Sequence, residues 1–99
     1  MKPSDISWCR RQLNMLTIGG VWAVPRSGLL FTKTGEDSMA LTDRLPIGFD
    51  GARECGASMD VAEQFATFEE WQQHDYETIR DYNKVAGIEV TDNTTKGEK

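Results

Sequence analysis

The single histidine of the chain, His74, is the residue best suited by type to acid–base or metal chemistry. Its neighbours at helical spacing are Glu70 one turn earlier and Thr78 one turn later, with Asp75 beside it. A histidine–carboxylate pair could act as a general base or supply half of a metal site. Both roles need further ligands or a nucleophile, and no motif of this sequence signals them. We therefore interpret His74 as a solvated histidine on a helix.

Three acidic residues whose carboxylates could in principle bind a cation, Asp43, Asp50 and Glu54, lie in a segment that also contains glycines. Their spacing does not match a calcium-binding loop, which needs oxygen ligands at alternate positions and a glutamate at the twelfth. The segment Gly48–Gly51 is not followed by the Lys-Ser/Thr pair of a phosphate-binding loop. We therefore predict no metal, no cofactor and no catalytic residue.

The two cysteines, Cys9 and Cys55, are isolated in sequence and form no Cys-x-x-Cys pair. We interpret both as reduced structural thiols, because free cysteine usually behaves as a small buried hydrophobe. An enzyme whose site combines His74, carboxylates and Cys55 is an alternative that no spacing supports. The sequence therefore predicts a protein that is not an enzyme.

Arg10, Arg11 and Arg26, together with Trp8 and Trp22, form the best nucleic-acid-binding pattern of the chain. A guanidinium can hold a phosphate while an aromatic ring stacks on a base. Two adjacent arginines are nevertheless ordinary on the solvated side of a helix. The net charge of −5 also disfavours attraction to a phosphate backbone, so we do not expect a nucleic-acid partner.

Charge is segregated along the chain, because residues 54 to 81 carry eight acids and one base, Arg80. These acids are Glu54, Asp60, Glu63, Glu69, Glu70, Asp75, Glu77 and Asp81. Such a segment can form a solvated helix surface, dock on a basic patch of a partner, or imitate the phosphates of DNA. The aromatic residues Trp71, Tyr76 and Tyr82 of the same segment could anchor a protein partner. Our candidate partner-binding residues are Glu69, Glu70, Glu77, Asp81, Tyr76 and Arg26.

The bulk composition indicates one small globular domain. A chain of 99 residues can bury a single core, and 38% hydrophobic with 27% charged residues is ordinary for such a domain. We expect the domain to span residues 1–91 and residues 92–99 to form a mobile polar tail. The first residues lack the apolar region of a secretory signal, and no apolar run is long enough for a membrane. We therefore expect a cytoplasmic location in the producing or host cell.

The first half of the chain predicts one helix followed by a β-meander. Ser4 or Asp5 can cap a helix that ends near Gly19-Gly20. Its apolar face contains Ile6, Cys9, Leu13 and Leu16. The β-favouring runs 21–24 and 29–32 flank a turn at Pro25–Gly28, and residues 38–42 can return as a third strand.

The second half predicts a loop and one or two helices. Periodicity disappears from Asp43 to Ala57, where we expect a loop that covers the core. Capping boxes at Asp60/Glu63 and Thr67/Glu70 predict a short helix over 60–65 and a main helix over 68–86, although one continuous helix fits as well. The apolar stripe of the main helix contains Phe68, Trp71, Ile79, Tyr82 and Ala86, with Asp75 and Tyr76 at its centre. Gly87 ends this helix with a hydrophobic contact from Ile88, and residues 88–90 either add a short strand or merely pack.

These elements predict an α+β fold with an N-terminal helix, a two- or three-stranded antiparallel meander, and a long C-terminal helix packed on the sheet. Small acidic chains of this type resemble, in size and composition, accessory proteins of bacteriophages and other mobile elements. With the segregated charge, this resemblance implies a non-catalytic protein that binds a host protein as a modulator or inhibitor. The alternatives are a self-associating homodimer and an acidic DNA mimic that blocks a nucleic-acid-binding protein.

Overall fold

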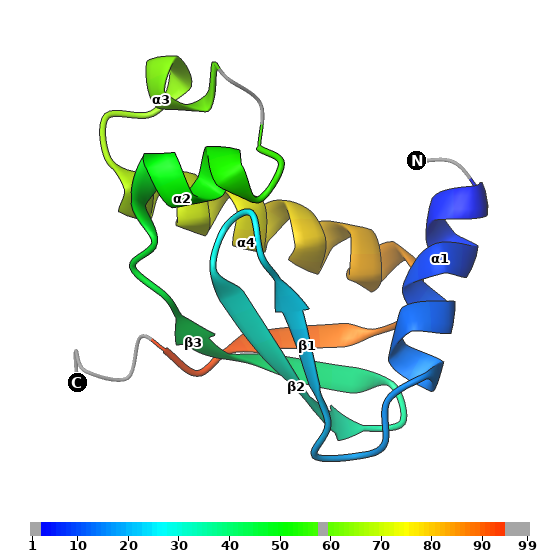
Figure 1. Ribbon diagram of the computed structural model, residues 1–99. Helices are drawn as coiled ribbons and strands as arrows, with labels where there is room; N and C mark the ends of the chain where they lie inside the picture. Colours follow the sequence, from blue (N-terminus) through cyan, green and yellow to red (C-terminus); the bar gives the residue numbers. More distant parts are fainter. Residues whose placement is uncertain (1–2, 58–59, 95–99) are drawn as a thin grey trace.

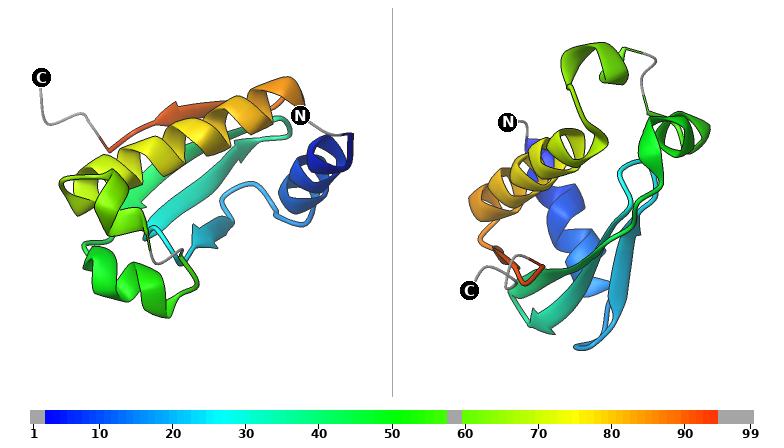
Figure 2. Two further views of the ribbon diagram at one scale, coloured as in Figure 1. Left: turned by 90° about the horizontal axis from the view of Figure 1, so that it is seen from above. Right: turned by 90° about the vertical axis from the view of Figure 1, so that its left-hand side faces the viewer.

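The computed structural model describes residues 3–57 and 60–94 and shows an α+β fold (Figure 1). In chain order its elements are α1 (Pro3–Asn14), β1 (Val21–Val24), β2 (Leu29–Gly35), β3 (Ser38–Arg44), α2 (Gly48–Glu54), α3 (Val61–Gln64), α4 (Phe68–Val85) and β4 (Glu89–Asp92). The four strands of the described residues form one sheet, and α1 and α4 lie on the same face of it (Figure 2). Helices α2 and α3 lie near one end of α4, so the other sheet face carries no helix of the described residues.

The sheet is mixed, with the strand order β1-β2-β3-β4. Strands β1, β2 and β3 form the predicted antiparallel meander. The prediction of a purely antiparallel sheet was incomplete, because β4 pairs with β3 in parallel. A parallel neighbour needs a crossover connection, and the segment that contains α2, α3 and α4 provides it.

The hairpin turn between β1 and β2 requires a glycine at position 28. Gly28 has a φ of +72°, and a Cβ atom there would lie 2.6 Å from the carbonyl oxygen of Leu45. The left-handed φ and the close approach both exclude a side chain. This turn therefore brings the segment after β3 against the tip of the hairpin.

The hydrophobic core lies between the sheet and the two long helices. The side chains of Leu29, Phe31 and Leu41 are completely buried, and the inward face of α1 contributes Leu13. Alternate residues of β2 face the core, which explains why Leu29, Phe31 and Lys33 are buried while Leu30 and Thr32 are half-buried.

The helix boundaries correct several predictions. Helix α1 ends at Asn14 and includes residues 4 and 5, so it is shorter than predicted and the expected caps lie inside it. The predicted loop 43–57 contains α2, which is fixed by Ala52 in the core and by a ring contact between Phe49 and Phe68. Gly48 and Gly51 concealed this helix, because glycine has a low helix propensity and no side chain to show a period.

The segment 60–86 forms two helices, since Phe65 between α3 and α4 has an extended backbone. The side chain of Asp60 does not cap α3. At α4 the Thr67 hydroxyl accepts from the Glu70 N–H at 3.2 Å, as the predicted capping box requires, and the Glu70 carboxylate accepts from the N–H of Ala66, the residue before the cap, at 3.1 Å. Helix α4 therefore begins where its sequence predicts.

The end of α4 has the predicted glycine stop. Gly87 has a φ of +84°, its N–H donates to the Lys84 carbonyl, and the Ile88 N–H donates to the Asn83 carbonyl at 2.8 Å. This is the Schellman pattern, and Ile88 is buried as the motif requires. The chain then continues into β4, which decides between the two alternatives for residues 88–90.

The buried face of α4 is rotated from the predicted apolar stripe. Its buried residues are Phe68, Gln72, Asp75, Tyr76 and Asn83. Trp71 is half-buried and Tyr82 is exposed, so both lie at the margin of the face. Three polar side chains on this face have hydrogen-bond partners inside the fold, which the apolar pattern could not predict.

Candidate functional site

A hollow of about 310 Å³ lies between α1, β1 and α4. Its lining combines the rings of Trp8, Trp22 and Tyr82 with the polar side chains of Arg26, Thr78 and Asn83, and Cys9 and Ile79 complete it. Sequence reasoning placed Trp8, Trp22 and Arg26 in one weak pattern, and the structure brings these three residues together. Arg10, from the same pattern, instead pairs with Asp37 at 2.8 Å.

The aromatic rings of this hollow continue a row that begins in the core. Tyr76 stacks on Phe31 with centroids 6.2 Å apart, Phe31 contacts Trp22 at 5.5 Å, and Trp22 contacts the Trp8 ring at 5.9 Å. Trp8 is 45% exposed and Tyr82 is 42% exposed. The buried end of the row restricts the rings of Trp22 and Trp8, which favours binding because these rings have less side-chain entropy to lose, and Tyr82 joins the hollow from α4 outside this row.

Arg26 is held beside the hollow by a buried carboxylate. The Asp75 side chain is only 4% exposed and accepts from the Arg26 guanidinium at 3.1 Å and from the Ser27 hydroxyl at 2.6 Å. The Arg26 side chain remains 50% exposed. A guanidinium has five N–H donors, so its solvent-facing donors can bind an anion while Asp75 fixes its position.

The same cluster connects α4 to the hairpin tip and to the segment after β3. The Gln72 amide donates to the Ser27 carbonyl at 2.9 Å and to the Leu45 carbonyl at 2.8 Å. Ser27, in the turn between β1 and β2, is fully buried. The Asp75–Arg26 contact joins residues 49 positions apart in the sequence. The one feature of the sequence that pointed to it is the position of the Asp75 carboxylate within the predicted apolar stripe of the helix.

Tyr76, one of the candidate partner-binding residues, lies in the core and is 4% exposed. The guanidinium groups of Arg44 and Arg80 each lie 5.8 Å from its ring centroid. Burial and the nearby Asp92 carboxylate raise the pKa of the Tyr76 hydroxyl above 10.0. Its ring supports the sheet–helix contact, so we leave it out of the proposed binding surface.

The acidic candidates lie away from the hollow. Glu70, Glu77 and Asp81 project from the side of α4 opposite the sheet, within about 40° of one another at 3.6 residues per turn. Glu69 lies on the flank of the helix and is exposed. Arg80 contacts Asp81 at 3.2 Å, so basic side chains interrupt the acidic surface. Of the six predicted site residues, the hollow therefore contains Arg26.

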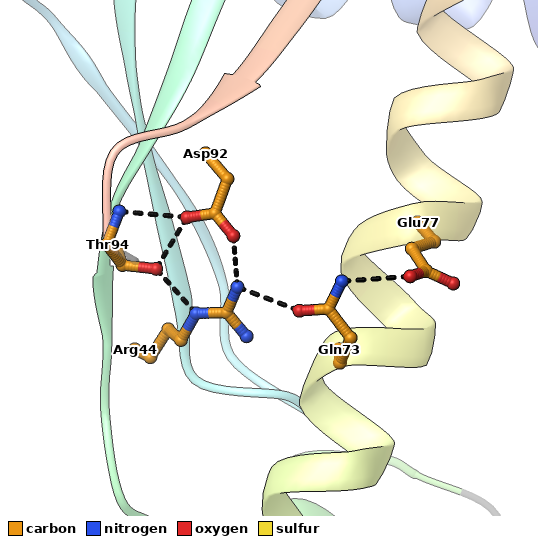
Figure 3. A network of polar contacts seen from close by, with 5 residues as sticks. All are labelled: Arg44, Gln73, Glu77, Asp92 and Thr94. Atoms are coloured by element: carbon orange, nitrogen blue, oxygen red, sulfur yellow. Dashed lines mark hydrogen bonds and ion pairs between the residues drawn. The ribbon is translucent and has the colours of Figure 1, made fainter. Parts of the chain in front are cut away.

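A polar network ties β4 to β3 and α4 (Figure 3). The Arg44 guanidinium donates to the Asp92 carboxylate, to the Thr94 hydroxyl at 2.6 Å and to the side-chain oxygen Oε1 of Gln73 at 2.9 Å, and the Gln73 side-chain amide donates to the Glu77 carboxylate. Burial alone would raise the pKa of Asp92, but the hydrogen bonds from Thr94 and the charge of Arg44 hold that pKa below 3.8. Asp92 and Thr94, which we assigned to the tail, belong to this network, and residues 95–99 lie outside the described residues.

His74 lies in an aromatic group at the first half of α4. Its ring centroid is 5.1 Å from that of Phe65 and 6.4 Å from that of Trp71, and the side chain is exposed. Within residues 3–57 and 60–94, no three histidine, cysteine or acidic side chains are grouped closely enough to hold a metal ion. In the same part of the chain no helix has the length and apolar character to cross a membrane.

A second hollow, of about 440 Å³, lies between the end of α4 and β4. Its lining combines the charged residues Arg80, Asp81, Lys84 and Glu89 with Gly87, Ile88 and Val90, and it contains no aromatic ring. Aromatic side chains and arginine dominate the energy of protein interfaces, so the hollow beside Arg26 is the better candidate.

No model of a protein family, no curated protein and no solved structure matches this chain.

Proposed function

We propose that this protein is a non-catalytic binding protein that modulates a larger protein partner. The partner inserts an apolar side chain into the hollow lined by Trp8, Trp22 and Tyr82, and an adjacent carboxylate of the partner binds Arg26. The observation that carries this proposal is a half-exposed guanidinium held by a buried carboxylate next to aromatic rings that the core fixes.

The chemistry of the hollow supports this kind of partner. Fixed aromatic rings provide a large apolar contact at low entropic cost, and arginine binds a carboxylate through two parallel hydrogen bonds. The acids of α4 lie on another side of the helix. There they would disfavour orientations that bring an acidic partner segment onto that side, and they would not bind it. The charge therefore favours a partner segment that is apolar and acidic together.

The direct test is selection from a displayed random peptide library on the immobilised protein. We expect enriched peptides to carry an aromatic or aliphatic residue close to Asp or Glu. Affinity for a synthetic version of such a peptide should fall at least about tenfold in Tyr82→Ala and in Arg26→Gln, since each removes one interface anchor. Val85→Ala is the matched control, because Val85 is also an exposed apolar residue of α4 and is not part of the hollow.

The acidic surface of α4 is tested in the same experiment. A variant with Glu70→Lys, Glu77→Lys and Asp81→Lys keeps the hollow and reverses three exposed or half-buried charges. If the selected peptides bind the two hollow variants normally and this variant poorly, the binding surface is the acidic helix and our proposal for the hollow is wrong. The alternative of a DNA mimic stays a prediction, and Arg80 and Lys84 on the same helix weigh against it.

A further inference from the structure

Strand β1 is an edge of the sheet formed by the described strands. The Lys33 N–H donates to the Gly20 carbonyl, so this carbonyl of the residue before β1 faces β2, while the Lys33 carbonyl accepts from the Gly19 N–H. Hydrogen-bonded positions alternate along an antiparallel pair. The backbone groups of Trp22 and Val24 therefore face β2, and those of Val21 and Ala23 face out from the edge.

The four residues of β1 carry no charge that would oppose pairing, and the strand is short and is followed by Pro25. Residues 15–24 contain no charged side chain, although 27% of the chain is charged. Met15, Ile18 and Val21 in this segment are 75%, 62% and 55% exposed. Edge strands are usually protected by lysine, proline or a β-bulge, and the opposite edge strand, β4, carries Glu89 and Asp92.

We propose that β1 pairs with β1 of a second copy of this chain, antiparallel and across a two-fold axis. The pairing forms one continuous sheet from both copies. The symmetric register places Val21 opposite Ala23 of the second copy and Trp22 opposite Trp22 of the second copy. In this register every outward N–H and carbonyl of Val21 and Ala23 acquires a partner.

Neighbouring positions fit the same register. Val24 lies opposite Gly20 of the second copy, which has no side chain to oppose it. Pro25 follows β1, and its missing N–H ends the pairing there. The two Trp22 side chains meet on the helix-covered side of the sheet, which extends the aromatic row of one copy into the other.

The distribution of charge favours a second copy of this chain as the partner of the β1 edge. A two-fold interface brings identical surfaces together, so each charge at its centre meets a like charge. Residues 15–24 avoid this penalty, whereas the acids of residues 54–81 lie on other elements. Each copy carries a net charge of −5, so salt should strengthen the association by screening the remaining repulsion.

Sedimentation velocity of the purified protein over a wide concentration range tests this proposal. We expect a reversible dimer in the wild type and a dissociation constant roughly thirtyfold higher in Ala23→Pro, which removes one outward N–H from each copy. Ala23→Thr is the matched control, because it keeps that N–H and should dimerise like the wild type. A wild type that stays monomeric at all concentrations overturns the proposal, as does an Ala23→Pro dimer of unchanged strength.

A second variant covers the case in which Ala23→Pro does not fold. Val21→Lys leaves the backbone unchanged and places a charge on the edge, where lysine opposes strand pairing. We expect this variant to be monomeric with an unchanged far-UV circular dichroism spectrum, and a persistent dimer contradicts the β1 interface. Trp22 lines the hollow and also lies in this interface, so peptide binding is measured on Val21→Lys as well as on the wild type. Peptide binding by a wild type that stays monomeric, or a wild-type dimer that selects no peptide, shows that one proposal fails without the other.

Discussion

Replacing Asp75 by alanine should destabilise the fold by about 3 kcal/mol, because this carboxylate is the buried acceptor that joins α4 to the hairpin. The Ser27 hydroxyl is fully buried and would lose its acceptor, which costs about 1–3 kcal/mol. Arg26 is half exposed, so water replaces much of its contact and its share is at most about 1 kcal/mol. Asp75→Asn keeps an acceptor oxygen and should cost about 1 kcal/mol.

Urea unfolding followed by tryptophan fluorescence measures this difference. With a slope of about 1.5 kcal/mol per molar urea, the unfolding midpoint should fall by about 2 M in Asp75→Ala and by less than 1 M in Asp75→Asn. The double variant Ser27→Ala, Asp75→Ala should be less destabilised than the sum of the single variants, since the two residues share one hydrogen bond.

Asp81→Ala is the matched control, because Asp81 is an exposed acid of the same helix and its removal should change stability by less than about 0.5 kcal/mol. If Asp75→Ala unfolds at the same urea concentration as the wild type, Asp75 is not a buried acceptor. The position of Arg26 beside the hollow would then lose its physical basis. If Asp75→Ala is destabilised as expected, its weakened peptide binding at a concentration where it is still folded would show that the pair also positions Arg26.

Three further predictions test other parts of the fold. Lys33→Met should cost about 2 kcal/mol in urea unfolding, because the buried ammonium donates to the Leu13 carbonyl in the last turn of α1 and to the Leu16 carbonyl just after it. The Leu13 carbonyl would keep the Leu16 N–H, so most of the loss falls on Leu16, and an unchanged midpoint would contradict this role. The pKa of Asp92 is lowered in the folded state, so its stabilising effect is present above pH 3.8 and is lost as the pH falls through the folded-state pKa. Asp92→Asn should therefore lose less stability between pH 5 and pH 2 than the wild type. Parallel curves of stability against pH for the two proteins would argue against the contact with Arg44. Gly28→Ala should lower the melting temperature by at least about 8 °C, because it meets the Leu45 carbonyl and strains the turn, and a stable variant would mean that the turn can relax.

Local patterns were sufficient to predict the antiparallel hairpins and both ends of α4. The capping box at Thr67, the Gly87 stop and the turn at Gly28 depend on residues close in sequence, so their geometry follows from short-range sterics and hydrogen bonds. Helix α2 was missed because its glycines hide the helical period, and its formation depends on contacts with Phe68 and the core.

The candidate site was only partly predictable for the same reason. The sequence indicated that aromatic rings and arginines recur in the first half of the chain, and it indicated Arg26 as a candidate. It could not show that Tyr82 from α4 would complete the hollow or that Tyr76 would be buried. Whether Tyr76 or Tyr82 is buried depends on a rotation of α4 about its axis by a fraction of a turn. The packing of Tyr76 on Phe31 of β2 decides this rotation.

The sequence by itself determined the three strands of the meander, where the long helix begins and ends, and how charge divides between the two halves of the chain. Only the tertiary structure decided that β4 pairs in parallel, that Asp75 is buried against Arg26 and Ser27, and that three aromatic rings from three elements share one hollow. The physical reason is the range of the interactions. Turns and caps are formed by neighbours in the chain, whereas a buried ion pair or a shared cavity exists only after distant segments have excluded water together.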